Sequence, residues 1–401
     1  MTNNPHPIRF ALLLGMMSAL GPLTIDMYLP AFPAIATDYN TTASLVQFSL
    51  TACLLGLGVG QLFTGPLSDV KGRRKPVLIF IFLYMLASVA CAFAPTIELF
   101  IAGRFLQGLA ASAGIVISRA IVRDVYHGKE LTTYFSLLVL VGNLVPILAP
   151  MFGSGVLLYT DWRGVFLVLG VIAFLLLIIV TLRLQETLPV ERRVPANLGQ
   201  TFRNFADLLR DRQFAGYALT QGLMIAGVFA YVAGTPFVYQ SIYGASPQLF
   251  SILFGANGIG LIIGSQMVGR LAHRISELTF MKVGLMIAGV SSASMLVAVL
   301  LHGPLFMIVV PMFFFVGSIG MVATSSFALA MATKSHVAGS ASALLGLLPF
   351  ALGSIVSPLV GIAGETTAVP MGAVILATSL LALLAFYGLA RPGSGTASSG
   401  Q

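Results

Sequence analysis

Twelve long apolar runs, separated by short polar gaps, dominate the pattern of this 401-residue chain. Each run is about as long as the roughly 20 apolar residues that an α-helix needs to cross a lipid bilayer. The runs cover residues 9–34, 44–66, 76–94, 98–121, 132–158, 163–184, 214–242, 248–270, 278–301, 303–331, 337–362 and 367–390. The pattern predicts an all-α membrane protein with twelve transmembrane helices.

The longest polar stretch divides these runs into six and six. It extends from Gln185 to Arg212 and is rich in charged residues. A second compositional change comes at Arg391, where a Gly/Ser-rich segment begins. We therefore expect four parts: an N-terminal six-helix half at 1–184, a cytosolic linker at 185–212, a C-terminal six-helix half at 213–390 and a flexible tail at 391–401.

The two halves repeat each other at a nearly constant spacing. Gly60–Gly65 resembles Gly264–Gly269, 204 residues later, and Pro150–Gly153 resembles Pro358–Gly361, 208 residues later. Both matches fall in corresponding runs of the two halves. This pattern is typical of two pseudo-symmetric halves around a central cavity.

The composition excludes a soluble protein. Hydrophobic residues make up 57% of the chain and charged residues only 8%, against roughly 25% charged in a soluble domain. The net charge of +8 does not indicate nucleic-acid binding, because the cations lie in short gaps between apolar runs and not on one face of a soluble module.

The distribution of Lys and Arg predicts the orientation in the membrane. With the N-terminus in the cytoplasm, 19 of the 21 cations fall in cytosolic gaps, and only Arg104 and Arg163 do not. Cytoplasmic loops carry an excess of such residues. We therefore expect both termini in the cytosol.

One polar string between the second and third runs places an acid among cations. Residues 65–76 read GPLSDVKGRRKP, with Gly72 suited to a tight turn. Asp69 lies at the C-terminal end of a helix, where the helix dipole disfavours a carboxylate unless an Arg or another helix N-terminus compensates. Asp69 is either part of a latch between helices or one member of a polar turn that only fixes the topology.

This string resembles the signature of the major facilitator superfamily, G-x-L-x-D-x-x-G-R-[RK]-x-[PV]. In that family the acid helps to hold the two halves together on the cytosolic side when the transporter opens outward. The second-half copy has His273 in place of the acid. The resemblance implies a latch motif of six residues: Gly65, Asp69, Gly72, Arg73, Arg74 and Arg123.

Further segments resemble the bicyclomycin-resistance (Bcr/CflA) group of drug:proton antiporters within that superfamily. They are TIDMYLP at 24–30, RFLQG at 104–108, RAIVRD at 119–124, PILAP at 146–150 and WR at 162–163. In this group the fifth helix is thought to seal the cavity against proton leak, whereas an ordinary kinked helix is the simpler interpretation. The resemblance implies a cavity seal made by Gly142, Pro146, Pro150 and Gly153.

Asp26 is the only carboxylate deep within an apolar run; every other acid lies at a loop, a helix end or the linker. A charge at bilayer depth costs roughly 2.5–3.5 kcal/mol on insertion scales, so an intramembrane acid is a candidate functional residue. Burial favours the neutral form of an acid, so that a proton can bind and leave. Alternatively, Asp26, about 26 Å along the helix from Arg9, has a structural role near the interface or at backbone freed by Pro30.

Arg104 is the only cation inside a span, roughly 9 Å into the fourth run. The functional interpretation is that it pairs with Asp26 or with a water that relays protons. The alternative is an arginine whose charged end extends outward to the interface.

Neutral polar residues within the runs are candidates for substrate contacts, although each equally suits a hydrogen bond to a neighbouring helix. The candidates are Tyr28, Gln47, Gln107, Asn143 and Tyr239.

Together with the resemblance, these observations predict an exporter of small, largely apolar drugs in the bacterial cytoplasmic (inner) membrane. It would work by alternating access in exchange for protons, with Asp26 and Arg104 in the coupling. The alternative is a proton-coupled exporter of a metabolite such as an amino acid or sugar. We expect no enzyme, because H-E-x-x-H, paired intramembrane carboxylates and a His/Cys cluster are missing from the sequence. Because a P-loop is also missing, we do not expect ATP to drive transport directly. The expected partners are a small-molecule drug, protons and the lipid bilayer; we expect a monomer without nucleic acid, metal or cofactor.

Overall fold

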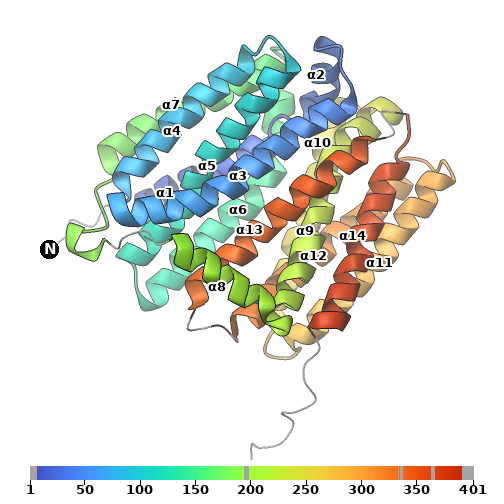
Figure 1. Cartoon of the computed structure of the whole chain (residues 1–401). Coiled ribbons are helices and arrows are strands. Elements are labelled where there is room, and N and C mark those ends of the chain that lie inside the picture. Colours follow the sequence, from blue (N-terminus) through green and yellow to red (C-terminus); the bar gives the residue numbers. More distant parts are fainter. Residues whose placement is uncertain (1–6, 194–197, 333, 335–336, 363–365, 391–401) are drawn as a thin grey trace, which may run out of the picture.

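The computed structural model describes residues 7–193, 198–332, 334, 337–362 and 366–390, so the expected tail at 391–401 lies outside it. All regular elements in these ranges are helical (Figure 1). Within them, twelve helical segments are long and apolar enough to cross a membrane. The prediction of an all-α, twelve-span membrane protein is confirmed.

The α-helices are α1 (Pro7–Asp26), α2 (Phe32–Asp38), α3 (Ala43–Lys71), α4 (Arg74–Ala92), α5 (Ile97–Val125), α6 (Gly128–Val156), α7 (Trp162–Arg183), α8 (Leu198–Arg210), α9 (Arg212–Pro236), α10 (Pro247–Leu271), α11 (Glu277–Leu300), α12 (Phe306–Ala332), α13 (Ala338–Val356) and α14 (Val369–Leu389). The shorter helical segments are η1 (Leu29–Ala31), η2 (Val190–Arg192), η3 (Phe237–Ile242) and η5 (Ser357–Gly361).

Three of the twelve spans are not regular α-helices throughout. The first changes to the 3-10 segment η1, the seventh to the π-helical η3, and the eleventh to the 3-10 segment η5. Pro30, Pro236 and Pro358 lie at these three changes. Proline has no N–H to continue the α-helical hydrogen bonds, which explains why the helix geometry changes there.

Repeated glycines explain the internal repeat in physical terms. In the first half, α3 packs on α5, and a Cβ at Gly60 would collide with the backbone of Leu109. In the second half, α10 packs on α12, and a Cβ at Gly264 would collide with the backbone of Gly317. The matched glycines therefore let equivalent helix pairs approach closely in both halves, as expected for membrane helices.

The halves meet mainly along two helix pairs, α3 with α13 and α6 with α10. We call the end with the α3–α4 loop and α8 the basic end, and the end with α2, η3 and η5 the far end. In Figure 1, α8 lies across the basic end and α2 lies at the far end.

Helix α8 lies within the stretch that the sequence marks as a linker. Its Phe205 and Leu208 are buried, and the helix packs against α9 and α13. Asn204 Nδ2 donates a hydrogen bond to Ser340 Oγ of α13 (3.1 Å). The polar stretch between the halves is therefore a packed surface helix over much of its length.

Candidate functional site

Asp26 is the last residue of α1, at the point where the first span changes its helix geometry. Only 5% of the residue is exposed. Its carboxyl group forms no hydrogen bond or ion pair with any part of the chain that the structure describes. The site therefore holds an acid at membrane depth whose charge no protein group compensates directly, an expensive arrangement that usually has a functional reason.

Arg104 of α5 is fully buried beside this change in helix geometry. Its Nη2 donates to the carbonyl oxygen of Thr24 (2.8 Å), two residues before Asp26. Its guanidinium carbon lies 4.0 Å from the centroid of the Tyr28 ring, a cation–π distance. Arg104 therefore binds the C-terminal end of α1, where a cation is favoured by the helix dipole.

The expected pairing of Arg104 with Asp26 is not formed in this structure. The second guanidinium nitrogen, Nη1, donates to Gln107 Oε1, and no Arg104–Asp26 contact within 4.0 Å occurs among the described ion pairs. Arg104 is occupied by a backbone carbonyl, an amide and an aromatic ring. It holds the backbone that positions Asp26 and makes no direct contact with the acid.

Two of the substrate candidates are bound within the first half. Gln107 is fully buried, and its Nε2 donates to Ser88 Oγ (2.8 Å). The Tyr28 hydroxyl lies 3.2 Å from Ser49 Oγ. In this conformation both side chains contact Arg104, Gln107 by a hydrogen bond and Tyr28 through its ring.

The second half contributes a polar cluster near Asp26. Tyr231 of α9 lies within electrostatic range of Asp26, and its hydroxyl accepts a hydrogen bond from Asn257 Nδ2 of α10 (3.0 Å). Within the described residues, Asn257 Oδ1 and the hydroxyl of the fully buried Tyr239 have no hydrogen-bond partner. Asn257 also interacts with Tyr239, so Tyr231, Tyr239 and Asn257 form one buried polar cluster in the second half.

Helix α6 closes the far end against α10. Ser251 Oγ of α10 donates to the carbonyl oxygen of Pro150 (2.9 Å), and Gln248 Nε2 donates to that of Ser154 (3.3 Å). A Cβ at Gly153 would collide with the carbonyl oxygen of Met27, so α6 lies directly against the end of α1. Of the expected seal residues, Pro150 thus lies in the contact that closes the far end, and Gly153 packs α6 on the end of α1 within the first half.

The remaining candidates on α6 lie nearer its middle. Pro146 and Asn143 are partly buried, and a Cβ at Gly142 would meet no neighbouring atom within 4 Å. The structure does not bring these three residues into the contacts that close the far end.

Helix α3 closes the far end a second time. Ser44 Oγ donates to the carbonyl oxygen of Gly361 in η5 (2.5 Å), and Gln47 Nε2 donates to that of Ala233 in α9 (3.1 Å). Gln47, a substrate candidate, is therefore an inter-half contact in this conformation.

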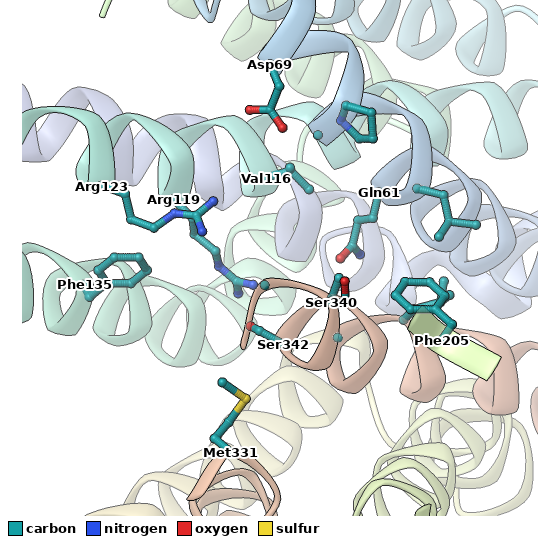
Figure 2. Close-up of a pocket in the computed structure, with 17 residues that line it drawn as sticks. Gln61, Asp69, Val116, Arg119, Arg123, Phe135, Phe205, Met331, Ser340 and Ser342 are labelled. Carbon is teal, nitrogen blue, oxygen red and sulfur yellow. The ribbon is translucent and has the colours of Figure 1, made fainter. Parts of the chain in front are cut away.

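A cavity of about 610 Å³ lies between the halves at the basic end (Figure 2). We call it the vestibule. Its walls come from α3, α5 and α6 on one side and from α8, α12 and α13 on the other. The lining residues are Gln61, Leu62, Gly65, Pro66, Asp69, Val116, Arg119, Arg123, Phe135, Phe205, Met331, Gly339, Ser340, Ser342, Ala343, Gly346 and Leu347. The molecule is closed at its far end and hollow at its basic end.

Two of the expected latch residues, Asp69 and Arg73, form a charged network with Asp124 inside the first half, whereas Arg123 forms no ion pair with a described residue. Arg73 Nη1 lies 2.5 Å from Asp69 Oδ1, and Arg73 Nε lies 2.7 Å from Asp124 Oδ2 of α5. Arg73 Nη1 also donates to Ser68 Oγ (2.7 Å). Gly72 has φ of +84°, which a residue with a side chain rarely adopts and which lets the loop turn back here.

Glu186, at the start of the polar stretch, fixes the other side of this loop. Its Oε1 accepts from the backbone N–H of Arg73 (2.7 Å), and its Oε2 accepts from that of Arg74 (3.2 Å). Partial burial alone raises the pKa of Glu186, but hydrogen bonds from Arg73, Leu188 and Arg74 and the charge of Arg193 outweigh it, so the pKa lies below its usual value. Glu186 is thus a carboxylate that caps the N-terminus of α4, a favourable position.

Comparisons with known proteins identify the family. The model of the Major Facilitator Superfamily matches residues 14–358. The chain belongs to the Major Facilitator Superfamily. The uncharacterized MFS-type transporter YdgK of Bacillus subtilis is 54% identical over 396 residues, which cover 98% of each chain. A bicyclomycin resistance protein homolog of Haemophilus influenzae is 31% identical over 378 residues, which cover 94% of this chain and 95% of the relative.

The fold agrees with this assignment. A bacterial homolog of the human lysosomal transporter Spinster, solved in an inward-facing conformation, superposes with a TM-score of 0.76 at 15% identity, covering 97% of this chain and 98% of that one. The resemblance to the bicyclomycin-resistance group is also confirmed. Members of the superfamily are membrane transporters of small molecules and not enzymes.

Three features of the site were not predicted from the sequence. The acceptor of Arg104 is the backbone carbonyl of Thr24, for which no residue type is a signal. Glu186 looks like one charge of many in the linker; its place directly after the sixth run, opposite a basic loop, is the only hint. Tyr231 carries no distinguishing pattern in an apolar helix.

Proposed function

We propose that this transporter exports small molecules from the bacterial cytosol in exchange for protons, by alternating access. The observation that carries the proposal is the buried Asp26 carboxyl, which has no partner among the described residues and lies at the end of α1, within electrostatic range of Tyr231 of the second half. An acid in this place is able to bind and release protons while the two halves move around it.

The orientation is part of the proposal. The basic end faces the cytosol, because its loops contain most of the cations, and both termini lie on that side. The protein then resides in the cytoplasmic membrane with residues 1–184 and 213–390 as its two halves. In this orientation the vestibule is open to the cytosol and the structure is the loading state of an exporter.

The proposed cycle uses the contacts of both ends. Substrate enters the vestibule, and Asp26 releases its proton toward the cytosol. The far-end contacts of α6 with α10 and of α3 with η5 then break, while Asp69 and its motif close the basic end. A proton from outside neutralises Asp26, after which the far end closes again over an empty site.

Arg104 has a positioning role in this cycle. By holding the Thr24 carbonyl it fixes the end of α1, so the Asp26 carboxyl stays buried within electrostatic range of Tyr231.

The test is transport by inverted membrane vesicles with an imposed pH gradient, with bicyclomycin as the first probe because a relative is named for resistance to it. The expected result is that Asp26→Asn abolishes gradient-driven uptake. The matched control is Asp207→Asn on the exposed face of α8, which should behave like the wild type. Undiminished proton-coupled transport by Asp26→Asn would remove Asp26 from the mechanism.

A further inference from the structure

Two arginines of α5 face the vestibule without a counter-ion. Arg119 and Arg123 are four residues apart and therefore lie on one face of the helix. Figure 2 shows both side chains extending into the space that also holds Ser340 and Ser342. Neither arginine forms an ion pair or hydrogen bond with a residue in the described part of the chain.

The remaining walls do not compensate these two charges. Asp69 is the one carboxylate in the vestibule lining, and its Oδ1 is already bound by Arg73 (2.5 Å). The lining from α12 and α13 contains no charged side chain. Arg119 and Arg123 also repel each other, so an anion bound between them removes a repulsion that exists in the empty vestibule.

The vestibule also offers neutral donors and an apolar wall. Gln61 Nε2 is buried without a partner among the described residues, and Ser340 and Ser342 supply hydroxyl groups. Phe135 and Met331 line the same cavity. A guanidinium group binds a carboxylate through two parallel hydrogen bonds, and the apolar wall suits a hydrocarbon body.

We propose that the vestibule is the loading site for small amphiphilic organic anions that carry a carboxylate, and that it disfavours cations of the same shape. This inference rests on the proposed function, in which substrate enters from the basic end. A cleft lined by charge of one sign concentrates ligands of the opposite sign and speeds their association. The inside-negative membrane potential also favours the outward movement of an anion.

The test is a matched ligand series measured by binding to the purified full-length protein at low salt. The probes are biphenyl-4-carboxylate, biphenyl-4-carboxamide and 4-(aminomethyl)biphenyl, which share one body and differ in charge. For the wild type we expect the carboxylate to bind at least about tenfold more tightly than the amine, with the amide between them. Raising the salt from about 50 to about 500 mM should reduce this ratio, because salt screens exposed charges.

Arg119 variants then assign the preference to the vestibule. Arg119→Gln should bring the ratio of the carboxylate affinity to the amine affinity to within about threefold of unity. Arg119→Lys keeps the charge but loses the two parallel N–H donors of the guanidinium group, so it should retain an intermediate ratio. The control is Arg203→Gln on α8, an exposed arginine outside the vestibule lining, which should leave the ratio unchanged.

Two results would overturn the proposal: equal binding of the three probes by the wild type, or an equal weakening of all three by Arg119→Gln. The binding measurement needs no proton gradient. A transporter that prefers the carboxylate but shows no proton-coupled uptake in vesicles would contradict the proposed function and leave the anion site intact; the reverse pattern would contradict only the anion site.

Discussion

The two ends of the molecule treat the boundary between the halves in opposite ways. At the far end, neutral side chains of one half donate to backbone carbonyls of the other, as Ser44 does to Gly361 and Ser251 does to Pro150. At the basic end the described ion pairs are Arg73 with two acids of the first half, Arg210 with Asp207 within α8, and Lys334 with Asp211 at the start of α9. Among the residues that the structure describes, no ion pair joins the halves.

This difference explains how the molecule can change conformation at a small cost in free energy. A neutral hydrogen bond contributes about 1 kcal/mol net, so a few of them close the far end and still break readily. Charged groups that are satisfied within one half lose no partner when the halves separate. We infer that the basic-end charges shape each half, whereas the far-end hydrogen bonds determine which conformation is populated.

At the far end we expect the largest effect from adding a side chain at Gly153. In Gly153→Ala the added Cβ would collide with the Met27 carbonyl, so α6 must move away from α1. We expect a destabilisation of about 3 kcal/mol and at least tenfold slower efflux, measured by thermal unfolding and by vesicle transport. In the control, Gly155→Ala, the Cβ meets nothing within 4 Å. Equal behaviour of the two variants would contradict the close contact of α6 with α1.

The strongest way to break the basic end is to remove Arg73. Arg73→Gln leaves Asp69 and Asp124 without their shared cation, and Asp124 is mostly buried. Because Asp69 is half exposed and therefore screened, we expect a loss of about 2 kcal/mol in unfolding free energy, less than for a fully buried pair. Thermal unfolding measures it, with the exposed Lys75→Gln as control. A wild-type melting temperature would argue against the network.

Much of this architecture can be predicted from the sequence, but several features of the site cannot. The sequence identifies Asp26 as a candidate because a charged side chain at bilayer depth costs free energy. The twelve spans follow from the lengths of the apolar runs. The end of α1 at Asp26 was not predictable, since Pro30 lies four residues further on. The far-end contacts were missed because their acceptors, such as the carbonyls of Gly361 and Ala233, belong to the backbone and have no residue signature.

A milder change at the far end is the loss of one hydrogen bond between the halves. Ser251→Ala removes one inter-half hydrogen bond, worth about 1 kcal/mol, and should shift the population toward far-end opening by roughly fivefold. Spin labels at the exposed Leu158 and Leu249 should then report longer distances across the far end. Ser294→Ala, whose hydroxyl bonds only within its own helix, is the control. An unchanged distance distribution would mean that Ser251 does not influence the equilibrium.

The smallest expected effect is the pH dependence that Glu186 gives to the basic end. Its pKa is lowered in the folded protein, so its contribution to stability is complete above the unfolded pKa of about 4.3 and is lost as the pH falls through the lower folded value. Because the side chain is exposed, we expect only about 0.5 kcal/mol. The melting temperature of Glu186→Gln should therefore fall less on acidification below pH ~4 than that of the wild type or of Glu191→Gln. Parallel curves for all three proteins would contradict this role.

The proposed mechanism requires that Asp26 takes up and releases a proton within the pH range in which the transporter works. Infrared difference spectra between wild type and Asp26→Asn, recorded between about pH 6 and 8, test it without any substrate. We predict a protonated-carboxyl C=O band in the wild type that fades as the pH rises and has no counterpart in the variant. A wild-type Asp26 that stays ionised, or stays protonated, throughout that range would contradict the account.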